Sequence, residues 1–261
     1  PAPRRVSGTR FTLHVGCPES DRVEIQNALR AYVLFGGYGS RTRRGTGSLT
    51  VDGREGSMPW LPREASRSEL TALFGRDIFE AIPSRPADDT PLLAGAWLST
   101  GSKAKEAEKA WATALAWLQD FRQGQPPSPL DRHDPAFARD WGDPMRPGRS
   151  NFPEADKVRR LSGPGRWAHD PRHNATPVYP RAGFGLPIIA QFQTRPSSGQ
   201  RYPNPEPDGY ELRWKDGKGK EHDRLASPLC LGIMPLADGQ FAPYALWLFR
   251  SYPEGGMVGL K

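Results

Sequence analysis

The chain of 261 residues has only two cysteines, Cys17 and Cys230, which lie far apart in the sequence. Two are too few for a disulfide framework, so we expect a reducing, cytoplasmic location. No apolar run approaches the ~20 residues that cross a bilayer, and no apolar stretch follows the basic residues at the start, as it would in a signal peptide. The sequence therefore predicts no membrane partner.

Several kinds of catalytic pattern are also missing. The acidic residues are scattered, without the compact cluster that would hold two magnesium ions, and no nucleophile-elbow motif is present. His169 and His173 imitate the spacing of metal ligands, but Pro171 between them disfavours a helix that would bring them together. Two solvated loop histidines are the simpler interpretation. We expect no metal, no cofactor and no catalytic residue.

What the chain does have is positive charge, with a formal net charge of +7, together with 28 glycines and 28 prolines. The charge fits a polyanionic partner without requiring one, and the glycine and proline content predicts long ordered loops. Both features are concentrated in residues 36–48, which contain no acidic residue. Glycine lets a polyanion approach the backbone, and arginine provides a planar donor fork for phosphate. The candidate RNA-binding residues in this loop are Gly36, Gly37, Gly39, Arg41, Arg43, Arg44, Gly45 and Gly47.

The surrounding pattern predicts an α+β fold. Residues 9–15 alternate polar and apolar and predict a strand, followed by a helix capped by Ser20 or Asp21 that ends near Gly36. That helix is expected to bury Val23, Ile25, Leu29 and Val33, and residues 48–52 predict a second strand. This β-α-loop-β order is typical of a ferredoxin-like (RRM-like) module.

Further elements are expected along the rest of the chain. Helices are predicted near residues 69–74 and over residues 102–123, the second with an apolar stripe that includes Trp111 and Leu118. Residues 125–180 are dense in proline and show no sustained periodicity apart from a short helix beginning near Pro153. Strands are predicted over residues 186–193, 210–214, 228–234 and 244–249.

The glycine-rich loop does not match the known nucleotide-binding motifs. It lacks the Gly-Lys-Ser/Thr ending of a Walker loop, and it follows a helix and precedes a strand, which is the reverse of the Rossmann order. A flexible solvent turn remains the alternative interpretation. Residues 181–186 echo the loop faintly, because both place an arginine and spaced glycines before a strand. Aromatic residues beside arginines in the proline-rich region suit either stacked single-stranded bases or loop anchoring: Trp141, Phe152, Trp167 and Tyr179.

Five segments, in order along the chain, resemble one family. The loop FGGYGSRTRRGTGSL (residues 35–49) resembles the glycine-rich loop of the RAMP superfamily of CRISPR proteins, and more narrowly the first-subunit family of the type III-B (Cmr) effector complex. The resemblance continues in WLQDFRQG (117–124), GRSNFPEADKVRR (148–160), RAGFGLPI (181–188) and RLASPL (224–229).

This resemblance implies ferredoxin-like RAMP modules with long Pro/Gly-rich loops. Residues 1–60 would be the C-terminal part of a first module with the glycine-rich loop, and residues 61–261 a second, elaborated module. The family usually opens with a first half carrying a Lys-Gly-x-Leu-Arg type loop, which this chain lacks, so an N-terminal portion is expected to be absent or supplied by another chain.

The implied function is that of a non-catalytic RNA-binding structural subunit. Its partners would be CRISPR guide RNA and/or target RNA and other RAMP subunits, with Arg149 and Arg181 as further contact candidates. No position matches the aspartate with which the backbone subunits of the family cut RNA. The alternatives are a guide-processing RAMP endoribonuclease that uses His14 as a base, and a protein–protein scaffold.

Overall fold

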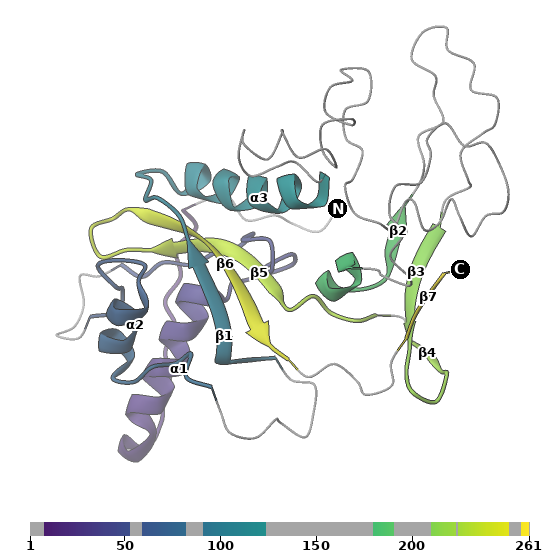
Figure 1. Ribbon diagram of the computed structural model, residues 1–261. Coiled ribbons are helices and arrows are strands. Elements are labelled where there is room, and N and C mark those ends of the chain that lie inside the picture. The colour runs from purple at the N-terminus through teal and green to yellow at the C-terminus, as the bar shows by residue number, and fades with distance from the viewer. Residues whose placement is uncertain are drawn as a thin grey trace, which may run out of the picture.

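The computed structural model describes residues 8–52, 59–81, 91–123, 180–190, 210–222, 224–250 and 257–260. Helices and two antiparallel sheets lie side by side, which confirms an α+β fold (Figure 1). The elements in chain order are η1 (Glu19–Asp21), α1 (Arg22–Phe35), α2 (Arg67–Phe74), β1 (Leu92–Thr100), α3 (Ala107–Gln123), η3 (Pro180–Phe184), β2 (Ile188–Ala190), β3 (Tyr210–Lys215), β4 (Glu221–His222), β5 (Leu229–Pro235), β6 (Phe241–Phe249) and β7 (Met257–Leu260).

The first sheet has the strand order β1-β6-β5 and is antiparallel throughout. Its central strand is β6, which forms a hairpin with β5 in which Leu231 pairs with Ala245 and Pro235 with Phe241. Strand β1 pairs with the other edge of β6, and its register shifts between Leu92 and Trp97. We did not predict β1 from the sequence.

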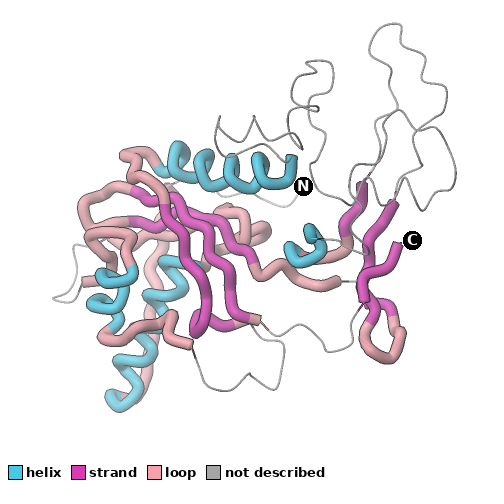
Figure 2. Tube along the Cα trace, in the orientation of Figure 1, coloured by secondary structure: helices cyan, strands magenta, loops and turns pink. Residues whose placement is uncertain are grey.

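Helices cover both faces of this sheet (Figure 2). Side chains alternate along β5, so Cys230 and Met234 face α1 and α2, whereas Leu229 and Leu231 face Ala114 of α3. The larger core lies on the α1 and α2 side, where the buried residues are Leu34, Leu70, Phe74, Phe79, Cys230, Met234, Leu236, Ala242, Tyr244 and Leu246.

Helix α1 has the predicted extent but a different inward face. Of the predicted inward residues, Val23 was wrong, because it is 62% exposed, whereas Ile25, Leu29 and Val33 are half-buried. The fully buried positions are Asn27, Arg30 and Leu34. The two polar residues are accommodated by hydrogen bonds: Asn27 donates to the carbonyl of Phe74, and Arg30 donates to Asn27 Oδ1 at 2.8 Å. The α1 core therefore includes a polar contact that apolar periodicity does not indicate.

Two predicted strands are absent as strands. Residues 9–15 and 48–52 form no ladder in the described part of the chain. The segments do approach each other, since Arg10 Nη1 lies 3.9 Å from Asp52 Oδ2. Phe11 and Leu13 are 65% and 61% exposed, so no described residue covers the apolar face that suggested a strand.

Helix α3 begins later than expected, at Ala107 rather than near residue 102. The preceding residues are held outside the helix by the first sheet, because Ala104 pairs with Phe241. Lys103 forms ion pairs with Glu64 and Asp238 at 2.8 and 3.3 Å.

The second sheet contains β2, β3, β4 and β7. Strand β3 pairs on one side with β2 and β4 and on the other with β7. Among the described residues its core is small, with buried Ala182, Leu186, Leu212 and Leu225. We predicted β2 and β3 from the sequence but not β4 or β7, which are short.

Candidate nucleic-acid-binding site

The glycine-rich loop leaves α1 at Gly36 and lies along the free edge of β5. Its two limbs are joined by the Tyr38 amide, which donates to the carbonyl of Gly47 at 2.8 Å. Arg44 forms a parallel bridge with Leu231, and the Leu231 amide donates to the carbonyl of Arg43 at 2.9 Å. The loop thus continues the first sheet at its β5 edge.

Helix α3 contacts the backbone of the loop at the same place. The Nε1–H of Trp111 donates to the carbonyl of Arg44 at 2.6 Å. We had assigned Trp111 only to an apolar stripe, and the structure adds this polar contact. The backbone that carries Arg43 and Arg44 is therefore hydrogen-bonded to both a strand and a helix.

Two glycines of the loop are required by the packing of the loop itself. Gly45 has φ +73°, and a Cβ there would lie 2.8 Å from the Trp111 ring. Gly47 has φ +77°, and a Cβ there would lie 1.9 Å from the carbonyl oxygen of Tyr38. A Cβ at Gly47 would require the backbone to move, and one at Gly45 would require the Trp111 ring to move. Their presence is explained by packing before any ligand is considered.

The arginines of the loop differ in exposure. Arg41 and Arg43 are exposed, whereas Arg44 is half-buried. Arg41 adopts φ 61°, an uncommon conformation for a residue with a side chain, and its carbonyl accepts from the Arg44 amide at 2.8 Å. The sequence identified the basic residues, and the structure separates two solvent-facing guanidinium groups from one turned inward.

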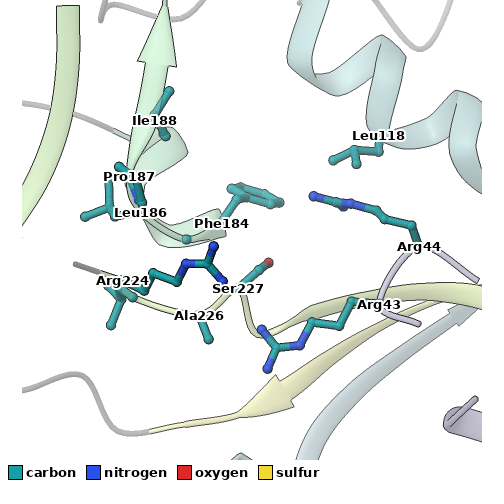
Figure 3. Close-up of a pocket in the computed structure, with 12 residues that line it drawn as sticks. Arg43, Arg44, Leu118, Phe184, Leu186, Pro187, Ile188, Arg224, Ala226 and Ser227 are labelled. Carbon is teal, nitrogen blue, oxygen red and sulfur yellow. The ribbon is translucent and has the colours of Figure 1, made fainter. Parts of the chain in front are cut away.

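A cavity of about 470 Å³ lies where this loop meets η3, β2 and the chain before β5. In Figure 3, Arg44 and Arg224 extend from opposite sides toward Phe184, and Arg43 lies on the side of Ala226 and Ser227. The complete lining is Arg43, Arg44, Leu118, Phe184, Gly185, Leu186, Pro187, Ile188, Arg224, Leu225, Ala226 and Ser227.

The cavity is strongly basic. Three of its lining residues are arginines and none is acidic. Within the described residues, Arg43 and Arg224 form no ion pair, although other arginines of the chain do, such as Arg67 with Asp77 at 2.6 Å. At Arg43 and Arg224, an anion would therefore meet guanidinium groups that no described carboxylate already neutralises.

The opposite wall of the cavity is apolar and closely packed. The Phe184 ring meets the Trp247 ring edge to face, with centroids 5.1 Å apart, and remains half-buried. Gly185 has φ +105°, and a Cβ there would lie 2.9 Å from the carbonyl oxygen of Leu225. Leu186 and Leu225 exchange two backbone hydrogen bonds at 2.8 and 3.0 Å, which joins the two segments of this wall.

The remaining candidate residues are only partly located. Arg149 lies outside the described residues, as do the proline-rich aromatics and the His169–His173 pair. Arg181 belongs to η3, next to the cavity-lining segment, but only its backbone is described. His14 lies in an exposed segment near the start of the chain that belongs to no helix or strand.

Sequence reasoning missed Arg224, Phe184 and Ser227 as candidate site residues. All three are in segments that we had matched to the RAMP pattern, so the signal was present, but nothing in the sequence indicated that these segments meet the glycine-rich loop.

The described residues offer little for nucleophilic or metal chemistry. Cys230 is buried beneath the loop; burial raises the pKa of its thiol, and nearby Arg43 and Arg44 only partly oppose this, so the thiol is poorly suited to attack. Among the residues described, no three His, Cys, Asp or Glu side chains are grouped to hold a metal ion. No helix in that part of the chain combines the length and apolarity that crossing a membrane requires.

Comparison with known proteins gives no relative: no family, no curated protein and no solved structure matches the chain.

Proposed function

We propose that this chain is a non-catalytic RNA-binding structural subunit of a type III-B CRISPR ribonucleoprotein. It contacts guide and/or target RNA through the phosphate backbone and lies beside other RAMP subunits in the cytoplasm. One observation carries the proposal. Every residue that lines the basic cavity belongs to one of four segments that resemble the RAMP pattern: 35–49, 117–124, 181–188 and 224–229.

The convergence supports the proposal because these segments are far apart in the sequence and were selected for resemblance alone. Arg43 and Arg224, which form no ion pair within the described residues, can donate the charge-assisted hydrogen bonds that phosphate accepts. Contacts of this kind position a nucleic acid without specifying its sequence. The ferredoxin-like architecture, and the division into residues 1–60 and 61–261, are part of the same proposal.

The test is the salt dependence of single-stranded RNA binding. Changing Arg41 and Arg43 to alanine should weaken binding and flatten the slope of log K against log salt by about 1.4, at ~0.7 per phosphate neutralised. Both side chains are exposed, so the fold should persist. The control is Lys218→Ala with Lys220→Ala, which removes the same charge from the exposed β3–β4 turn. Equal slopes in the two double variants would contradict the loop assignment.

The endoribonuclease alternative predicts a different result. Repeat RNA incubated with the protein in EDTA should stay intact if the subunit is non-catalytic, whereas metal-free cleavage that disappears in His14→Ala would favour the enzyme. A scaffold without RNA affinity would retain no RNA on a filter at low salt.

A further inference from the structure

We propose that Tyr38 is a base-stacking residue, which makes the glycine-rich loop a site for RNA whose bases are unpaired. The inference rests on the proposed function and goes beyond its phosphate contacts. Arginines on an exposed loop attract any polyanion, whereas an aromatic ring beside them distinguishes a strand with accessible bases from one without. Tyr38 lies in the same loop as the exposed Arg41 and Arg43.

The side chain of Tyr38 faces solvent and is 68% exposed. Within the described residues, neither its ring nor its hydroxyl has a ring contact or hydrogen bond, and its one hydrogen bond is made by the backbone amide. A structural tyrosine of this chain is different: Tyr244 is 3% exposed, and its ring meets Phe35 edge to face with centroids 5.8 Å apart. The ring of Tyr38 is therefore available to a ligand.

The backbone of Tyr38 is held on both sides. Its amide donates to the carbonyl of Gly47 at 2.8 Å, and its own carbonyl oxygen lies 1.9 Å from where a Cβ of residue 47 would be. The hydroxyl of Tyr32 donates to the carbonyl of Gly37 at 3.0 Å, which holds the peptide that leads into Tyr38. A tyrosine on a fixed backbone has only two χ angles to order, so a base that stacks on it costs little conformational entropy.

The surroundings of the ring leave room for a base. Tyr38 is flanked by Gly37 and Gly39, and a Cβ at Gly39 would meet nothing within 4 Å. Arg41 and Arg43 follow in the loop and form no ion pair within the described part of the chain. A single exposed aromatic residue needs no ligand to explain it. Its combination with open space and exposed guanidinium groups matches a nucleotide, which offers a base face and a phosphate, whereas an acidic peptide would match the arginines alone.

The experiment measures the affinity of the whole chain for three RNA probes of equal length: oligouridine, an abasic strand with the same phosphates, and the duplex of oligouridine with oligoadenosine. The wild-type chain should bind oligouridine about tenfold more tightly than the abasic strand, as expected for one stacked base. Tyr38→Ala should remove this difference and leave the affinities for the abasic strand and the duplex unchanged. Its slope of log K against log salt should equal that of the wild type, because no charge is removed.

Two further variants are the controls. Tyr38→Phe should bind like the wild type, because the ring and not the hydroxyl carries the stacking. Trp97→Ala removes a side chain that is 75% exposed from β1, at the opposite edge of the first sheet from the loop, and should change no affinity. Because the side chain of Tyr38 covers no core, Tyr38→Ala should fold.

The outcomes separate this inference from the proposed function. Equal affinity of Tyr38→Ala and the wild type for oligouridine, with a salt slope that depends on Arg41 and Arg43, would overturn the inference and leave the proposed function standing. A protein that binds none of the probes would overturn both. Weaker binding of all three probes in Tyr38→Ala would assign Tyr38 to the shape of the loop and overturn stacking. Oligoglutamate that binds as tightly as oligouridine would indicate an acidic protein partner and also overturn the inference.

Discussion

The two sheets of this protein are stabilised in different ways. The β1-β6-β5 sheet is covered by helices on both faces, with a large core on the α1 and α2 side. Within the part of the chain that the structure describes, the sheet built on β3 has a small core, and Ile189 and Met257 are 72% and 63% exposed on it. Regions with few buried apolar contacts open at lower free energy. The cavity lies between the two sheets. One of its walls belongs to the sheet with the larger core and the other to the sheet with the smaller core.

The largest expected effect comes from truncating one buried side chain in the core of each sheet, which tests the difference between the two cores directly. Met234 and Leu212 are both fully buried, the first in the large core and the second in the small one. Met234→Ala should lower the free energy of unfolding of the whole domain by roughly 2–5 kcal/mol. Leu212→Ala should instead release β3 and its neighbours while β5 and β6 stay folded.

Amide hydrogen exchange resolved along the chain measures both effects. In Leu212→Ala, protection should fall in β2, β3 and β7 and persist in β5 and β6. A uniform loss of protection in that variant would show that the two sheets unfold as one unit and would contradict the comparison.

A smaller effect is expected at the glycine-rich loop, where Gly47 and Gly39 form a matched pair. Both have positive φ, but only Gly47 would place a Cβ 1.9 Å from a backbone oxygen, and Gly39 has nothing within 4 Å. Both alanine variants carry backbone strain of order 1–3 kcal/mol. Gly47→Ala should lose additional stability, because the hydrogen bond between Tyr38 and Gly47 must open. Under the proposed function it should also weaken RNA binding.

The measurements are the thermal unfolding and the RNA binding of Gly47→Ala, each compared with those of Gly39→Ala. The second sheet should keep its protection in both, since the loop is attached to β5. Equal behaviour of Gly47→Ala and Gly39→Ala would mean that the loop relaxes freely around the added methyl group.

The smallest expected effect is a loss of stability at low pH that is confined to the second sheet. His222 lies 2.9 Å from Asp216 and stacks on Trp214 with ring centroids 4.2 Å apart. The hydrogen bond with His222, then the backbone amides of Lys220 and Lys218, hold the pKa of Asp216 below its ordinary value of 3.8. Because the folded pKa is the lower one, the stabilisation is present above pH ~4 and is lost as the pH falls through the folded pKa.

The measurement has to be local, because the pKa values of Asp77 and Asp238 are lowered too. Amide protection factors in β3 and β4, corrected for the intrinsic slowing of exchange in acid, should fall below pH ~4 in the wild-type chain. In Asp216→Asn this acid-induced loss of protection should be absent, whereas β5 and β6 should respond as before. An unchanged acid response in the variant would exclude Asp216 as its source.

Much of the first sheet could be predicted because its strands and helices have clear local patterns. Helix α1 ends at Gly36 and β5 and β6 are apolar runs, as expected. Strand β1 was missed because Gly95, with φ +75°, interrupts its alternation at the bulge. The strand predicted over residues 9–15 was wrong for the opposite reason. The alternation of polar and apolar residues is clear, but pairing depends on a neighbouring strand that the local sequence does not specify.

The basic residues of the loop in the candidate site could be predicted from the sequence, but the shape of the cavity could not. Glycine and arginine content identified the loop, yet Gly45 is explained by the Trp111 ring and not by a ligand. The contribution of Arg224 and Phe184 depends on segments separated by well over a hundred residues from the loop, and only the fold brings them together.

The hydrogen bonds from Leu231 and Trp111 to the carbonyls of Arg43 and Arg44 have a thermodynamic consequence. The conformational entropy of this stretch of backbone is lost when the domain folds, before any ligand arrives. A ligand that binds here has only side-chain rotamers left to order, at roughly 0.5–1.5 kcal/mol for each arginine. Association at this part of the loop therefore requires no coupled folding step, and its rate follows from diffusion and charge.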